Sequence, residues 1–125
     1  MAKTGATGIR RIINAGKYSA QGLKAAWKNE AAFRQEVVPA VFLTIAAPFM
    51  PNLALSEILI LMFMPWFVVI VEILNSAIEA VVDRMGDEWN ELSGRAKDLG
   101  SAAVTVALIL CFGAWIAIPV ARYCL

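Results

Sequence analysis

Polar and hydrophobic residues occur along this chain in long blocks. Apolar runs begin at Val37, Ile58 and Leu99, and each continues for about 20 residues before a polar or charged segment follows. A helix of that length crosses the ~30 Å hydrocarbon core of a bilayer. The pattern therefore predicts an all-α membrane protein with three transmembrane helices, over about residues 34–52, 57–85 and 97–121.

The segment before the first apolar run has a different periodicity. Ile9, Ile12, Ile13, Leu23 and Trp27 recur at helical spacing, with Lys and Arg on the other side. This pattern predicts an amphipathic helix over residues 9–33 that lies on the membrane surface, packs against the protein's own spans, or does both. The small, polar, Gly-rich residues 1–8 are expected to be disordered.

Composition supports a membrane protein with one domain, residues 1–125. Hydrophobic residues make up 60% of the chain and charged residues 17%, whereas soluble domains are about 45–50% apolar. The net charge of +1 gives no indication of nucleic-acid binding, and the absence of His excludes a His-based triad or a His-ligated zinc site. Cys111 and Cys124 lie thirteen positions apart on one predicted helix, so they form no local disulfide.

The distribution of charge predicts the orientation in the membrane. Most Lys and Arg residues precede the first apolar run, and Arg84, Arg95 and Lys97 lie in the polar segment 83–98. The turn at residues 51–57 carries only Glu57. Because basic loops stay in the cytoplasm, we expect the N-terminus and residues 83–98 on that side and the C-terminus on the other.

The second apolar run carries polar residues on one face. At about 100° per residue, Glu72, Asn75, Glu79 and Asp83 fall within an arc of roughly 80°. The helical rise from Ile58 puts Glu72 about 21 Å into the bilayer, inside the hydrocarbon, and Glu79 about 10 Å further, at the cytoplasmic interface.

These depths indicate phosphoryl transfer between water and lipid. A carboxylate in the bilayer costs up to ~3 kcal/mol, which is more than helix packing requires, although hydrogen bonding between helices remains the simpler alternative. Glu72 is placed to accept the proton of a lipid hydroxyl, while carboxylates at the interface can bind a magnesium–nucleotide complex and Lys97 can neutralise phosphate charge. Glu30 is a candidate second metal ligand, or an ordinary surface residue paired with Arg34. No P-loop or soluble-kinase motif is present.

Four segments resemble the prokaryotic diacylglycerol kinase family. They are "RIINAGKYSAQGLKAAW" (11–27), "EAAFRQE" (30–36), "VEILNSAIEAVVDR" (71–84) and "ELSGRAKDLGSAAV" (91–104). The resemblance covers most of residues 9–104 and implies a homotrimer of three-span protomers in the bacterial inner membrane, with active sites shared between subunits. It also implies ATP-dependent, magnesium-requiring phosphorylation of diacylglycerol to phosphatidic acid.

The resemblance further implies a role for individual residues. Glu72 corresponds to the general base, Asn75 and Lys97 complete the catalytic set, and Glu30 and Glu79 correspond to the magnesium ligands. Nucleotide contacts correspond to Arg11, Tyr18, Glu30, Glu79, Glu88, Trp89, Asn90, Lys97 and Asp98. Lipid contacts correspond to Ser19, Lys24, Trp27, Ala32, Arg34, Gln35, Glu36, Glu72 and Ser101. Trp89–Asn90 stands where the family has an aromatic–His pair.

Two other functions are compatible with parts of the pattern. Undecaprenol kinase, a relative with the same fold, would use the same depth arrangement for a different lipid alcohol. A small proton-coupled transporter could use Glu72 alone. Such transporters generally have four spans, and they have no use for the charged residues at the interface.

Overall fold

The computed structural model describes residue 5 and residues 7–125, and every regular element among them is helical. The elements are α1 (Gly8–Asn29), α2 (Ala31–Ala46), the short 3-10 helix η1 (Ala47–Phe49), α3 (Leu55–Arg84) and α4 (Glu91–Tyr123). The prediction of an all-α protein is confirmed for this part of the chain. The expectation of disorder over residues 1–8 falls mostly on residues outside the described set, and Gly8 already belongs to α1.

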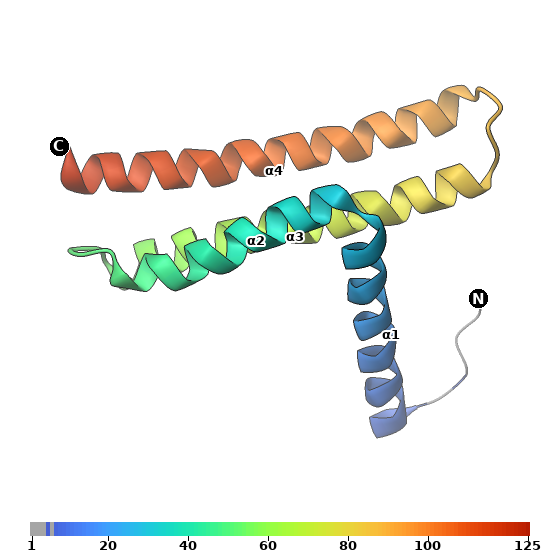
Figure 1. Ribbon diagram of the computed structural model, residues 1–125, viewed down its shortest axis with the longest axis horizontal. Coiled ribbons are helices and arrows are strands. Elements are labelled where there is room, and N and C mark those ends of the chain that lie inside the picture. Colours follow the sequence, from blue (N-terminus) through green and yellow to red (C-terminus); the bar gives the residue numbers. More distant parts are fainter. Residues whose placement is uncertain (1–4, 6) are drawn as a thin grey trace.

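α3 is the central helix of the molecule. It packs against α2 and against α4, and these three helices run lengthwise together, whereas α1 projects from them at a steep angle and packs against α2 (Figure 1). Phe33, Ala40 and Val69 form the small buried core, which the end of α1 reaches through Ala26.

Two helices are long and apolar enough to cross a membrane. They are α3, with 30 residues, and α4, with 33 residues. Little of either apolar stretch is buried within the chain, so lipid or another polypeptide is needed to cover them. α2 has 16 residues and does not reach that length by itself, so the first predicted span, residues 34–52, is not established by this criterion.

The predicted surface helix over residues 9–33 is wrong at its C-terminal end. α1 stops at Asn29 because Glu30 has an extended backbone, with φ −114° and ψ 102°. The Nη1 of Arg34 donates to the carbonyl oxygens of Trp27 at 2.5 Å and Lys28 at 3.3 Å. These bonds satisfy carbonyl groups that the end of a helix leaves without partners, and they stabilise the elbow between α1 and α2.

The α-helix that carries the predicted first span, residues 34–52, ends before the predicted boundary. α2 stops at Ala46, and Pro48 lies at the start of η1, which ends at Phe49. Pro48 and Pro51 have no backbone N–H to continue an α-helix, and Asn52 turns the chain with φ 62°. By contrast, α4 begins six residues before the predicted position 97. Asn90 caps α4, because its Oδ1 accepts hydrogen bonds from the N–H groups of Leu92 and Ser93.

The turn after η1 is fastened to the end of α4. Arg122 Nε lies 2.9 Å from both carboxylate oxygens of Glu57, and Arg122 Nη2 lies 2.8 Å from one of them. The hydroxyl of Tyr123 donates to the carbonyl of Pro51 at 2.6 Å. We call Glu57 and Arg122 the distal ion pair, since they lie at the end of the molecule opposite the loop between α3 and α4 (Figure 1).

Candidate active site

The polar face of α3 is present and is partly buried. Glu72 is 6% exposed and is the one buried charged side chain among the described residues. One turn later, Asn75 Nδ2 donates to Glu79 Oε1 at 3.2 Å. A buried charge needs compensating partners, and the neighbours of Glu72 therefore decide what this face can do.

Three further carboxylates lie near Glu72. Glu79 from α3, Glu30 from the elbow and Glu36 from α2 are all close enough for charge interactions with it, and the Asn75 side chain adjoins it. Glu30 reaches this position because the helix breaks there. The alternative in which Glu30 pairs with Arg34 is not realised, since Arg34 donates to the end of α1. In the described part of the chain, no three His, Cys, Asp or Glu side chains are arranged to hold a metal ion.

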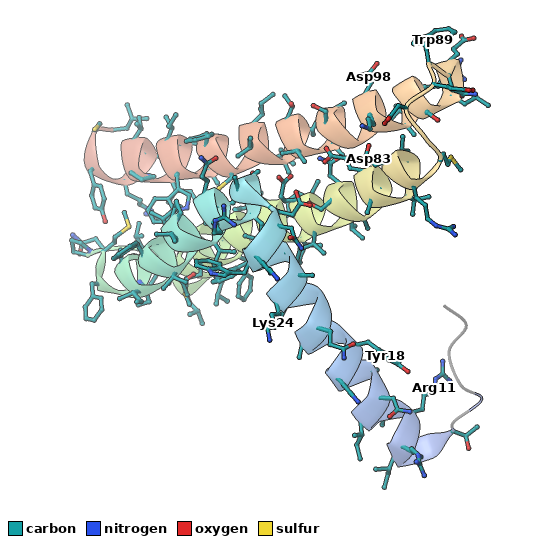
Figure 2. The ribbon with its side chains drawn as sticks, turned by 45° about the vertical axis from the view of Figure 1, so that its right-hand side comes forward. Arg11, Tyr18, Lys24, Asp83, Trp89 and Asp98 are labelled. Atoms are coloured by element: carbon teal, nitrogen blue, oxygen red, sulfur yellow. The ribbon has the colours of Figure 1, made fainter. Side chains whose placement is uncertain are left out.

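α4 contributes a cation and a close contact to the polar face. Lys97 Nζ lies 2.6 Å from Asp83 Oδ1 in a partly exposed ion pair, and its ammonium is also near Glu79. Gly100 is buried against the Asn75 side chain. Asp98 lies two positions before Gly100, about 160° around the helix, and points away from α3 (Figure 2). Within one chain, therefore, Lys97 joins the site and Asp98 does not.

The nucleotide and lipid residues expected on α1 are also distant from Glu72. Arg11, Tyr18 and Lys24 are spread along α1, which extends away from the other helices (Figure 2). The Ser19 hydroxyl donates to the Ala15 carbonyl of its own helix at 2.9 Å. The structure of one chain does not bring these four residues to the polar face.

The segment at residues 88–90 lines a separate hollow. The hollow has a volume of about 750 Å³ and lies between the end of α3 and the start of α4, where Glu88, Trp89 and Asn90 form part of its wall. Trp89 is 87% exposed (Figure 2). Ala77 and Val81 also line this hollow, and each is two positions from Glu79, so the hollow opens on the other side of α3 from the polar face.

Two of the expected lipid contacts line an apolar cavity. Gln35 and Glu36 lie at a cavity of about 310 Å³ whose other walls come from α2, α3 and α4. One carboxylate oxygen of Glu36 is buried and has no hydrogen-bond partner among the described residues. Among the other expected lipid contacts, Ala32 and Arg34 are half-buried, and Trp27 and Ser101 are exposed.

Sequence reasoning missed one residue that shapes the site and gave another a different role. Arg34 is predicted as a lipid contact, yet its guanidinium fixes the elbow that presents Glu30. Gly100 is not among the predicted residues, although it contacts Asn75. Its small neighbours in "GSAAV" are the only signal that could have indicated close helix approach at this point.

Comparison with known proteins gives one family. The family model described as prokaryotic diacylglycerol kinase matches residues 17–119. The diacylglycerol kinase of Escherichia coli K12 is 54% identical over 109 residues, which cover 87% of this chain and 88% of the relative. The diacylglycerol kinase of Haemophilus influenzae is 49% identical, covering 87% of this chain and 92% of the relative. That of Pseudomonas aeruginosa is 46% identical, covering 89% of each. The chain therefore belongs to the prokaryotic diacylglycerol kinase family of enzymes.

Proposed function

We propose that this protein transfers the γ-phosphoryl group of ATP to the hydroxyl of diacylglycerol and releases phosphatidic acid at the cytoplasmic membrane interface. The observation that carries the proposal is the buried carboxylate of Glu72 beside the hydrogen-bonded Asn75–Glu79 pair. Burying a carboxylate in a span without a neutralising cation is costly, and a reaction that needs a proton acceptor at that depth accounts for the cost.

The residues suggest a direct transfer. The Glu72 carboxylate takes the proton of the lipid hydroxyl, and the hydroxyl oxygen attacks the γ-phosphorus. The bond between that phosphorus and the bridging oxygen breaks, and ADP leaves with the bond's electron pair. Lys97 is held beside Glu79 by Asp83, with Nζ 2.6 Å from Asp83 Oδ1, where its ammonium can shift to the phosphate oxygens.

Glu30 and Glu79 would hold the magnesium ion of ATP. Mg²⁺ usually takes only one or two protein carboxylates, with phosphate oxygens and water completing its six positions, so a set smaller than three acidic residues is sufficient. The bound ion would neutralise charge on the phosphates. Asn75 Nδ2 donates to Glu79 Oε1, so the amide orients the carboxylate that would hold the ion.

The positions of the nucleotide residues favour a homotrimer with shared sites. Arg11 and Tyr18 lie on the projecting α1, and Asp98 points away from α3 (Figure 2). If these residues bind ATP together with residues 88–90, they do so at the site of a neighbouring copy. The apolar sides of α3 and α4 that are left uncovered give such copies a surface to share.

We further propose that residues 1–125 form one membrane domain with three spans and a cytoplasmic N-terminus, in the bacterial inner membrane. At the usual rises per residue, α2 and η1 together extend about 30 Å, which matches the hydrocarbon core although α2 alone does not. The lipid would then contact residues along α1 and α2 and one on α4, namely Ser19, Lys24, Trp27, Ala32, Arg34, Gln35, Glu36 and Ser101.

The test is a transfer assay with γ-labelled ATP in mixed micelles that contain diacylglycerol and undecaprenol together. We expect the label in phosphatidic acid, and none when Glu72→Gln protein replaces the wild type. Label in undecaprenyl phosphate alone would identify the polyprenol as the substrate instead. No label in either lipid would overturn the kinase proposal.

A further inference from the structure

Gly100 lies at the tightest contact between α3 and α4. A Cβ atom built on Gly100 would overlap Asn75 Oδ1, and it would lie 3.2 Å from Asn75 Cγ and 3.9 Å from Asn75 Cα. The distance to Cα is an ordinary van der Waals contact, so the overlap is with the Asn75 side chain. Adding a methyl group would therefore force the Asn75 amide to move, or force the two helices apart.

This restriction is confined to one position of α4. Gly94 and Gly113 belong to the same helix, and a Cβ on either would meet no atom within 4 Å. None of the three has a positive φ, so backbone conformation does not require glycine at any of them. Glycine is needed at position 100 because the Asn75 side chain faces it.

The Asn75 amide is constrained on its other side as well. Its Nδ2 donates to Glu79 Oε1 at 3.2 Å, while its Oδ1 is buried with no hydrogen-bond partner among the described residues. Moving the amide to make room for a methyl group would break the bond to Glu79. The carbonyl side does not compensate for that loss, because Oδ1 has no hydrogen bond to exchange among the described residues.

We propose that Gly100 is a positioning residue of the phosphotransfer site: its lack of a side chain seats the Asn75 amide, which in turn orients the Glu79 carboxylate. This inference rests on the proposed function, because Glu79 matters here as a ligand of the magnesium–ATP complex. It predicts that a change on α4, at a residue that touches no substrate, alters the magnesium requirement of the enzyme.

A double-mutant cycle tests the inference. The wild type, Gly100→Ala, Asn75→Ala and the double variant are assayed for kcat, for KM for ATP and for the magnesium concentration at half-maximal rate. We expect Gly100→Ala and Asn75→Ala each to lower kcat by about 10- to 100-fold and to raise the magnesium requirement, because both changes remove the bond that orients Glu79.

The double variant gives the decisive comparison. Truncating Asn75 removes the atom that the new methyl group would overlap, so the double variant should behave like Asn75→Ala alone. If the two losses multiply instead, Gly100 acts independently of Asn75 and the inference is wrong. If Gly100→Ala does not fold, the double variant should fold, and an unfolded double variant would likewise contradict the steric explanation.

Gly113→Ala is the matched control. Its new methyl group meets nothing, and alanine is the better helix former, so kcat, magnesium requirement and thermal unfolding midpoint should stay at or above wild-type values. A fully active Gly100→Ala with an unchanged magnesium requirement would overturn the inference and leave the proposed function standing. Wild-type protein without kinase activity would instead overturn the proposed function itself.

Discussion

The two ends of α3 carry the same kind of side chain in opposite surroundings. Glu57, near the first turn, contacts Arg122 through both of its carboxylate oxygens and also accepts a hydrogen bond from the N–H of Ala54. Glu72 and Glu79, toward the other end, lie near each other and near Glu30, with the Asn75 amide between them. A carboxylate whose bonds are all made within the protein serves structure, whereas a cluster of carboxylates that outnumbers its nearby cation, Lys97, attracts a positively charged ligand.

The basic residues of α4 follow the same division. Arg122 is fixed on Glu57 by two hydrogen bonds from Nε, whereas Lys97 makes one contact, with Asp83, and both of those side chains are largely exposed. Arginine presents several donors in a rigid fork, and lysine presents a mobile point charge. The mobile charge is therefore at the end of the molecule where we place the chemistry.

The largest expected effect distinguishes Glu72 from Glu57 directly. Glu72→Gln should lower kcat by about 10²- to 10⁴-fold, because an amide cannot accept the hydroxyl proton. The change keeps the shape of the side chain, so the thermal unfolding midpoint should not fall. The measurement is ATP-dependent phosphorylation of diacylglycerol alongside thermal unfolding in the same detergent.

Glu57→Gln is the matched control on the same helix. It removes a carboxylate whose partners are all protein groups, so its kcat should equal that of the wild type. Near-normal turnover by Glu72→Gln would show that another group takes the proton.

The next effect concerns the carboxylate that Asn75 orients. Glu79→Gln should raise the magnesium concentration at half-maximal rate by about 10-fold or more, because a neutral amide binds Mg²⁺ more weakly than a carboxylate. Rates measured over a magnesium titration at fixed ATP test this. Glu91→Gln is the control, since that exposed carboxylate on α4 pairs only with Arg95 at 3.5 Å. An unchanged magnesium curve for Glu79→Gln would remove Glu79 from the ligand set.

Helical spacing is sufficient to predict the polar face of α3. Glu72, Asn75 and Glu79 fall on one side by periodicity alone, and the apolar neighbours of Glu72 already indicate burial. The motifs around these residues also indicate the family, which the comparisons confirm. Local pattern is enough here because each conclusion concerns residues within a few turns of one helix.

Features that depend on distant partners could not be predicted in the same way. The apolar stripe of α1 continues past Asn29 without a Gly or Pro to mark its end, and the elbow depends on Arg34 reaching back to Trp27 and Lys28. The contact between Gly100 and Asn75 joins two helices and has no sequence periodicity. The start of α4, by contrast, could have been predicted from local sequence. Asn before a helical pattern is a known start signal, and the prediction that this span begins at residue 97 overlooked Asn90.

A smaller effect separates the two possible roles of Asn90. Asn90→Ala should lower the free energy of unfolding by about 1 kcal/mol, because two N–H groups at the start of α4 lose their acceptor. Asn90→Ser keeps an acceptor and should recover most of that loss. Chemical denaturation of the three proteins measures the difference. KM for ATP then separates a role as helix cap from a role as nucleotide contact. An equal rise of KM in both variants would mean that the Asn90 amide contacts the nucleotide itself. A rise in Asn90→Ala alone would mean that the cap positions residues 88–90.

The smallest effect lies at the distal ion pair. Arg122→Gln should lower the thermal unfolding midpoint by no more than a few degrees, because ion pairs that are partly open to solvent contribute little, and the Tyr123 hydroxyl still bonds to the Pro51 carbonyl. The double variant Glu57→Gln/Arg122→Gln should unfold at about the same temperature as either single variant, since each single change already removes the ion pair. All three should keep the wild-type kcat and magnesium requirement. A loss of activity in a folded Arg122→Gln would mean that the two ends of α3 are coupled, and the division between a structural end and a catalytic end would then fail.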